Sequence, residues 1–249
     1  SYLDIFRRED YFSQYYRAHF APQIALPFRP FSWLSFNLTA GARLTAWGDS
    51  LRTRAEVRES EDGNRFRGES LSRLSPTVFL EIVGPSFSKI WDTDGKHFSK
   101  VKHLIEPRVS YFREPVFEEE DRIPLFDEID LVTGFDAVRY SVINRFLAKP
   151  QGEEDSAREI LSFEFFELYS LDPERPLQVS RDQMLTSQRG PLSLRIRFLP
   201  SFNTLLQIET RYSTLFSQIA SNAVSGTFRL GTHNLGIRWS QRVEVESGE

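Results

Sequence analysis

Residues 33–47 alternate between apolar and polar side chains more strictly than any other stretch of the sequence. Every even position is apolar, and the odd positions between the two terminal tryptophans carry Ser, Asn, Thr, Gly or Arg. Successive side chains of a strand point to opposite faces, so the pattern predicts a β-strand with one apolar and one polar face. The length suits a tilted membrane strand better than a soluble one, which typically has about five or six residues. We expect Trp33 and Trp47 to lie in interfacial aromatic girdles, although a soluble sandwich strand would show the same alternation.

Similar alternation recurs along the chain and predicts about eleven antiparallel strands joined by hairpins, with no helix. Residues 1–14 show no clear period, and residues 215–230 show a weak one. The other strands are expected within residues 20–26, 51–58, 67–83, 103–112, 137–148, 158–171, 192–198, 202–212 and 235–245. The fold class predicted from this pattern is all-β.

The predicted connections alternate in length from residue 113 onward. The long connection at 113–135 is followed by a short one at 149–157, and the long connection at 172–190 by a short one at 199–201. Outer-membrane barrels have long loops outside and short turns inside, so this rhythm favours an up-and-down barrel. The 84–98 connection is too long for the inner side and disagrees with the pattern.

Composition narrows the class further. No apolar run approaches the ~18 residues of a transmembrane helix, and a net charge of −4 with a pI near 5.7 gives no support to nucleic-acid binding. The chain has no cysteine, and 26 of its 31 basic residues are arginine. Arginine pairs in a fork with carboxylates or phosphates, but the bias of a GC-rich genome explains the excess equally well.

The 113–135 connection is rich in carboxylates and is expected to be too polar for burial. It is interpreted as a solvated loop. Two alternatives are a divalent-cation site at Asp127, Glu128 and Asp130, and an acid–base pair such as Glu120 with Asp127. No nucleophile elbow, phosphate loop or metal-spaced cluster is visible, so neither an enzyme, nor a cofactor, nor a metal site is predicted.

Three motifs follow one another within residues 99–149: HLIEPRVSYFREP, then IPLFDEID, then VRYSVINRFLAK. Their order and spacing resemble the core signature of the LptD family, the outer-membrane barrels that place lipopolysaccharide in the outer leaflet of Gram-negative bacteria. The resemblance spans most of the chain, is strongest at 101–148 and is weak after 214. The signature residues, expected to be architectural, are His103, Glu106, Pro107, Tyr111, Pro124, Phe126, Asp127, Glu128, Asp130, Tyr140, Asn144 and Arg145.

The resemblance implies an antiparallel up-and-down transmembrane β-barrel in the cell outer membrane. Residues 1–249 would be a portion of this single barrel domain, without the N-terminal periplasmic jellyroll and some barrel strands. Lipopolysaccharide would pass without catalysis through the lumen and a lateral gate. The implied partners are lipopolysaccharide, an LptE-like lipoprotein plug, a periplasmic LptA-like bridge and outer-membrane lipid. Another outer-membrane barrel, a TonB-dependent transporter or a porin, remains an alternative, as does a soluble all-β binding or hydrolase domain.

Arginines on the polar faces of the predicted strands are the candidate lumen-lining residues. They either pair with Glu106, Glu209, Glu244 and similar neighbours to fill the lumen, or contact phosphates of a passing glycolipid. The residues are Arg43, Arg139, Arg145, Arg195, Arg197, Arg211 and Arg238.

Overall fold

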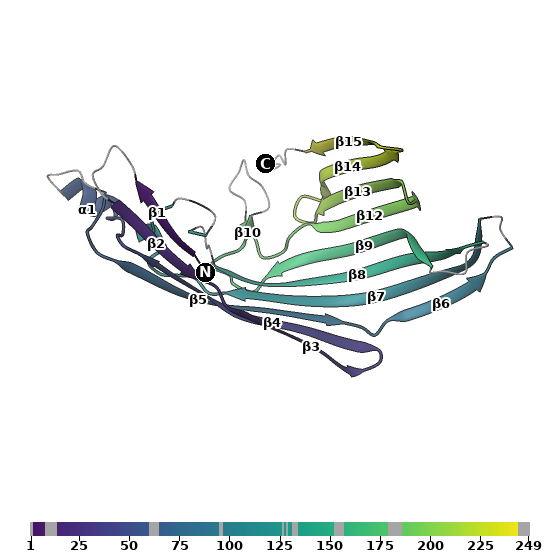
Figure 1. The fold of residues 1–249 in the computed structure, drawn as a ribbon, viewed down its shortest axis with the longest axis horizontal. Coiled ribbons are helices and arrows are strands. Elements are labelled where there is room, and N and C mark those ends of the chain that lie inside the picture. The colour runs from purple at the N-terminus through teal and green to yellow at the C-terminus, as the bar shows by residue number, and fades with distance from the viewer. Residues whose placement is uncertain are drawn as a thin grey trace. The chain divides into compact units, whose positions relative to one another are not determined.

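The computed structural model describes residues 2–7, 14–59, 65–94, 97–125, 127, 129–130, 134–151, 157–178 and 186–243. Thirteen strands form one antiparallel sheet, which confirms the all-β class (Figure 1). The strands are β1 (Tyr2–Arg7), β2 (Gln14–Phe20), β3 (Gln23–Phe31), β4 (Leu34–Trp47), β5 (Leu71–Val83), β6 (Phe87–Asp92), β7 (Phe98–Glu114), β8 (Phe135–Pro150), β9 (Arg158–Ser170), β12 (Leu192–Ser201), β13 (Thr204–Ser213), β14 (Gln218–Leu230) and β15 (His233–Arg242).

The order of the strands follows the chain, as the hairpin pattern predicts. It runs β1-β2-β4-β5-β7-β8-β9-β12-β13-β14-β15, while β3 pairs with β4 and β6 pairs with β7. Within the described residues this eleven-strand path does not close, so the sheet is a partial barrel wall. A separate pair, β10 (Leu177–Gln178) and β11 (Thr186–Ser187), lies within the connection from β9 to β12.

Six residues of the 84–98 connection form the strand β6, which leaves only short breaks on either side of it. Gly84 and Pro85 interrupt the chain after β5, and β6 then pairs with β7 from Phe87 opposite Ile105 to Asp92 opposite Lys100. Proline cannot donate to a ladder, so the strand restarts beyond it. The connection from β6 to β7 is reduced to residues 93–97. Long connections at 48–70, 115–134 and 171–191 alternate with short ones as far as β13, beyond which the connections at 214–217 and 231–232 are both short.

Residues 51–58 do not form the predicted strand. Residues 54–59 form a short helix instead, α1 (Arg54–Glu59). Thr53 and Glu56 cap its first turn by hydrogen-bonding each other's backbone amides. The Thr53 amide donates to Glu56 Oε2 at 2.8 Å, and the Glu56 amide donates to Thr53 Oγ1 at 3.3 Å. This capping box satisfies amides that a helix start otherwise leaves unpaired.

Two other boundaries differ from the predictions. The 192–201 strand continues through the expected turn at 199–201 with an irregularity between Phe198 and Ser201, and the reversal falls at residues 202–203 instead. Residues 2–7, for which no period was visible, form β1 opposite β2. The long strand expected at 33–47 is confirmed as β4.

The described residues divide into two compact units. Unit 1 comprises residues 1–26, 37–80 and 112–136, and unit 2 comprises residues 27–36, 81–111 and 137–249. Unit 1 contains a hydrophobic core of Trp47, Leu71 and Ile123, with Phe66 and Phe117 packed against it. No helix of the described residues is long and apolar enough to cross a membrane.

Candidate functional site

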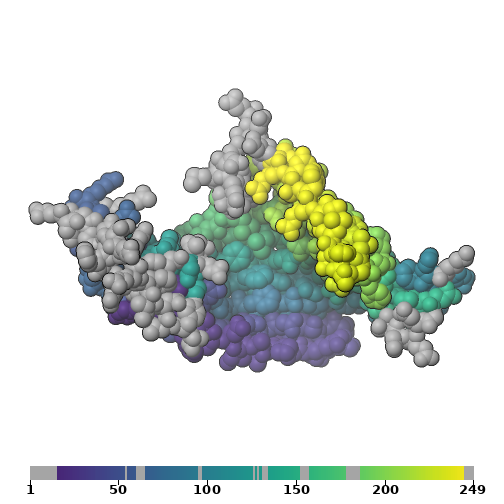
Figure 2. Space-filling model, turned by 45° about the horizontal axis from the view of Figure 1, so that its top comes forward, coloured from purple at the N-terminus to yellow at the C-terminus, as the bar shows by residue number. Residues whose placement is uncertain are grey.

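One face of the sheet in unit 2 carries a polar side chain on every strand from β8 to β15. Cross-strand partners share a face, and the register joins Arg145, Ser162, Arg197, Gln207, Ser225 and Arg238 into one row from β8 to β15. A neighbouring row runs Glu164, Arg195, Glu209. β15 ends this part of the sheet, and Figure 2 shows it in yellow at the surface. The predicted arginines of unit 2 therefore lie on one face.

Alternating charges form a connected network on this face. Glu164 lies 2.7 Å from Arg139 and 3.4 Å from Arg195, and Glu209 lies 3.1 Å from Arg195 and 2.8 Å from Arg211. The network spans β8, β9, β12 and β13. It agrees with the interpretation that most of these arginines neutralise glutamates of neighbouring strands.

Arg197 and Arg238 differ from the other predicted arginines. Both are exposed, and among the described residues neither forms an ion pair. Arg43, in unit 1, lies 3.7 Å from Glu114. Glu244, one of the expected partners, lies outside the described residues. Arg197 and Arg238 thus retain the donors that a phosphate would need.

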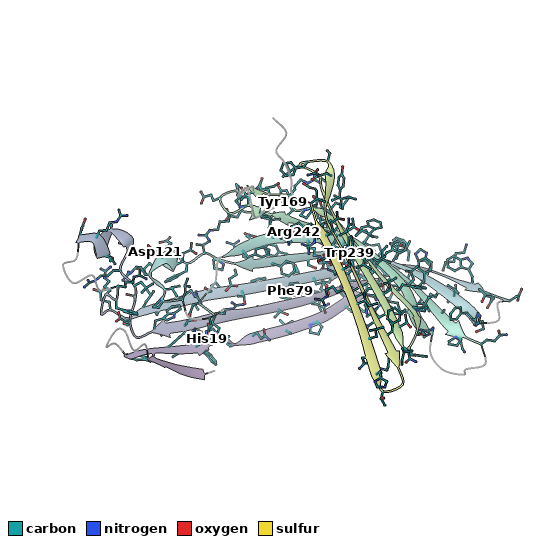
Figure 3. The ribbon with its side chains drawn as sticks, turned by 90° about the horizontal axis from the view of Figure 1, so that it is seen from above. His19, Phe79, Asp121, Tyr169, Trp239 and Arg242 are labelled. Atoms are coloured by element: carbon teal, nitrogen blue, oxygen red, sulfur yellow. The ribbon has the colours of Figure 1, made fainter. Side chains whose placement is uncertain are left out.

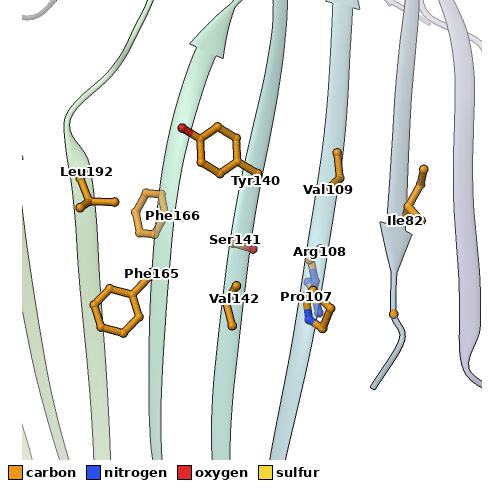
Figure 4. A pocket seen from close by; sticks show the side chains of 11 residues that line it. Ile82, Pro107, Arg108, Val109, Tyr140, Ser141, Val142, Phe165, Phe166 and Leu192 are labelled. Carbon is orange, nitrogen blue, oxygen red and sulfur yellow. The ribbon is translucent and has the colours of Figure 1, made fainter. Parts of the chain in front are cut away.

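The opposite face of unit 2 is apolar and carries a hollow of about 410 Å³. Figure 4 shows its wall, to which Ile82, Val142, Phe165 and Leu192 contribute from different strands. At one end the Tyr140 hydroxyl donates to Glu167, which Arg189 binds with two hydrogen bonds of 2.9 and 3.1 Å. This pairing keeps the nearly buried Glu167 carboxylate neutralised on an apolar face.

Signature residues pair with one another between β7 and β8. The His103 ring lies 3.0 Å from Asn144 Oδ1 and stacks on Phe146, with 4.3 Å between ring centroids. Glu106 lies 3.0 Å from Arg145. Tyr111 lies on β7, and the Pro107 carbonyl accepts a hydrogen bond from Gly84.

A second group of charges lies buried in unit 1 beneath the acidic connection. Asp130, 2% exposed, accepts hydrogen bonds from Arg17 at 2.8 Å and from the Trp47 indole at 3.0 Å. Arg73 donates to the backbone carbonyls of Ile129 and Asp130 at 2.7 and 3.3 Å and lies over the Trp47 ring at 5.1 Å. These hydrogen bonds hold the 113–135 connection against β2, β4 and β5.

The buried network corrects two expectations. The 113–135 connection is not wholly solvated, because Ile123, Pro124 and Asp130 are buried. Trp47 is 1% exposed and belongs to the core, whereas Trp33 is 49% exposed. A girdle position for Trp47 was wrong because its side chain lies on the polar face that this connection covers.

The cation-site interpretation finds no support among the described residues. Arg17 binds Asp127 with two hydrogen bonds of 2.8 and 2.7 Å, and these lower the pKa of the Asp127 carboxyl. Within the described residues no group of three or more metal-binding side chains gathers. Phe126 and Glu128 lie outside the described residues.

Arg17 and Arg73 were not predicted, and isolated arginines in a strand give no sequence signal for a role in a buried charge network.

Comparison with known proteins adds one finding. The family model described as LPS transport system D matches residues 3–230. No curated protein matches the chain.

Proposed function

Because this chain belongs to the LptD family, whose members transport lipopolysaccharide, we propose that its sheet forms part of the wall of an outer-membrane barrel through which the lipopolysaccharide glycan passes. The observation that carries the proposal is the two-faced sheet. One face presents arginine, glutamate and serine rows, and the other presents aliphatic and aromatic side chains. This is the division between lumen and lipid that a transmembrane barrel requires.

In this arrangement the polar face lines the lumen and the apolar face contacts lipid. The long connections at 48–70, 115–134 and 171–191 lie on the outer side, together with the short one at 214–217, and the turns at 93–97, 202–203 and 231–232 lie on the periplasmic side. Translocation involves no covalent step in this proposal. The Arg139–Glu164–Arg195–Glu209–Arg211 network gives the wall a nearly neutral, hydrated surface over which a glycan can slide.

The partners proposed here are those of the LptD family. The periplasmic LptA-like bridge delivers lipopolysaccharide through a jellyroll domain, and an LptE-like lipoprotein occupies the barrel. The lipid portion leaves sideways between the first and last strands of the complete barrel. We assign no residue of this chain to that gate.

Arg197 and Arg238 are the best candidates in unit 2 for contact with the phosphates of the passing glycolipid. They share one row with Ser162, Gln207 and Ser225, all of which offer further hydrogen bonds. Guanidinium groups without a carboxylate partner bind phosphate more strongly than those already neutralised. The contact must remain weak and transient, since the substrate moves on.

The test is made in the full-length protein in its native host. Depletion should stop newly made lipopolysaccharide from reaching the cell surface. The double variant Arg197→Gln and Arg238→Gln should assemble normally, judged by heat-dependent electrophoretic mobility, but slow surface arrival severalfold in a pulse–chase measurement. Arg211→Gln is the matched control, because Arg211 is already bound by Glu209.

Each result bears on a different part of the proposal. Surface arrival that is unchanged after depletion contradicts the transport function. Normal export by the double variant, with normal assembly, removes the phosphate role of Arg197 and Arg238 and leaves the transport function in place.

A further inference from the structure

A hollow of about 300 Å³ opens on the polar face of unit 1, between the break that separates β2 from β3 and the strands β4, β5 and β7. Gly41 shapes its wall, because a Cβ there would lie 2.9 Å from the Pro22 carbonyl oxygen and 3.0 Å from Thr77 Oγ1. Only glycine lets these segments approach so closely. The close approach of these segments beside the hollow is therefore set by the backbone at Gly41.

Three phenylalanines gather around this hollow on the polar face, apart from the buried core of Trp47 and Leu71. The Phe79 and Phe112 ring centroids lie 4.9 Å apart, and those of Phe112 and Phe135 lie 6.2 Å apart. Phe79 is labelled in Figure 3. Phe112 interrupts the polar row of β7, where Glu106, Arg108 and Ser110 precede it at alternate positions. An apolar cluster on a wetted face needs an apolar partner to be favourable.

Charged groups border the same hollow. Arg43 Nε lies 3.7 Å from Glu114 Oε1, and the Glu114 side chain is only 17% exposed. This buried carboxylate oxygen accepts no hydrogen bond within the described part of the chain. A buried acceptor without a donor is unfavourable, so a ligand that donates a hydrogen bond would stabilise the site.

We infer that this hollow is a binding subsite for about one or two sugar units of a glycan. The inference rests on the proposed function, which brings a glycan along this face. A sugar ring has an apolar C–H face, which fits the negative faces of the Phe79 and Phe112 rings. Its rim of hydroxyls supplies a donor for Glu114 and acceptors for Arg43.

Other parts of the glycolipid fit this hollow less well. The Glu114 carboxylate repels a phosphate, and an acyl chain would leave both Arg43 and Glu114 without hydrogen bonds. Thr39, Thr77 and Gln23 add neutral polar groups to the lining. This mixture of one aromatic surface with convergent polar groups specifies a hydroxyl-rich, uncharged ligand.

The experiment uses the full-length protein in detergent and the core oligosaccharide of the host's own lipopolysaccharide, freed from lipid A by mild acid. Binding is measured by calorimetry and by ligand-observed saturation-transfer NMR. Phe112→Leu should weaken binding about fivefold to tenfold, since an aromatic contact contributes that much. Glu114→Gln should weaken it by a similar factor, because the amide oxygen still accepts the sugar hydroxyl but without the carboxylate charge that strengthens the hydrogen bond. Phe165→Leu, the same change on the apolar face, should leave binding unchanged.

Heat-dependent mobility separates binding from assembly, and Glu114→Gln carries the test if Phe112→Leu does not assemble. Equal binding by Glu114→Gln and the unmodified protein overturns the inference. So does the absence of any oligosaccharide binding in a protein whose depletion still stops export, and in that case the transport function stands. Export that survives depletion refutes the proposed function itself, whatever the binding result.

Discussion

Each unit has a polar sheet face that carries arginines and carboxylates, and the two units differ in how deeply these charges are buried. In unit 1 the 113–135 connection covers the part of the polar face around Trp47, and Arg17, Arg73 and Asp130 are at most 2% exposed. In unit 2 the face is open, and Arg139 and Arg195 are 28% and 38% exposed. A buried charge network specifies one arrangement because each member depends on the others, whereas exposed pairs are screened and individually replaceable.

The largest effect is expected from removing the centre of the buried network. Asp130→Ala leaves Arg17 without one carboxylate and Trp47 without its acceptor, and a broken buried pair typically costs about 3–5 kcal/mol. The full-length variant should assemble poorly and unfold at lower temperature, as heat-dependent mobility measures. Asp127→Ala is the matched control and should have a smaller effect, because Asp127 is 40% exposed. Equal effects of the two variants would show that burial is not the decisive difference.

A smaller effect is expected from the same type of change on the open face. Glu164→Gln removes the charge that links Arg139 and Arg195. Glu164 is 14% exposed, but its partners are 28% and 38% exposed, and pairs that water reaches contribute about 1 kcal/mol or less. The shift in unfolding temperature should be slight and should diminish in high salt. A fall in unfolding temperature as large as that of Asp130→Ala would show that the charges of the two units do not differ in their contribution to stability.

The smallest effect concerns pH and Asp127. Hydrogen bonds from Arg17 lower the pKa of Asp127 below its usual value of 3.8, so the carboxylate contributes fully at neutral pH. That contribution is lost only as the pH falls through the lowered pKa. Limited proteolysis within residues 113–135 should therefore be independent of pH down to about 4. Loosening that begins between about pH 7 and 5 would contradict this assignment, and Asp127→Asn should remove the acid dependence.

The sheet could be predicted because alternation is a local property. β4 and β15 follow directly from the periodicity of their own residues, and the motif order at 101–148 gave the family that the family model confirms. The helix at Arg54–Glu59 was missed although its signal was present. Residues 51–58 alternate as a strand does, but the Thr53–Glu56 capping box favours a helix over a strand here.

The buried network of unit 1 could not be predicted in the same way. Arg17 and Asp130 are 113 positions apart, and nothing in either segment specifies the other. Alternation correctly placed Trp47 on the polar side of β4, but it does not reveal whether that side is covered. Whether a loop covers a strand face depends on the tertiary structure. From the sequence, a tryptophan at a strand end fits a membrane interface as well as it fits a covered core.

Side-chain contacts between β7 and β8 fix the register of this strand pair, which the alternation of polar and apolar residues does not determine. A slip of one strand by two residues would keep every side chain on its original face, so the polar and apolar character of the two faces would not change. The His103–Asn144 and Glu106–Arg145 contacts exist in only one alignment, and a slip breaks both at once. A strand pair fastened in this way can find its alignment from its own side chains, before the rest of the wall is in place.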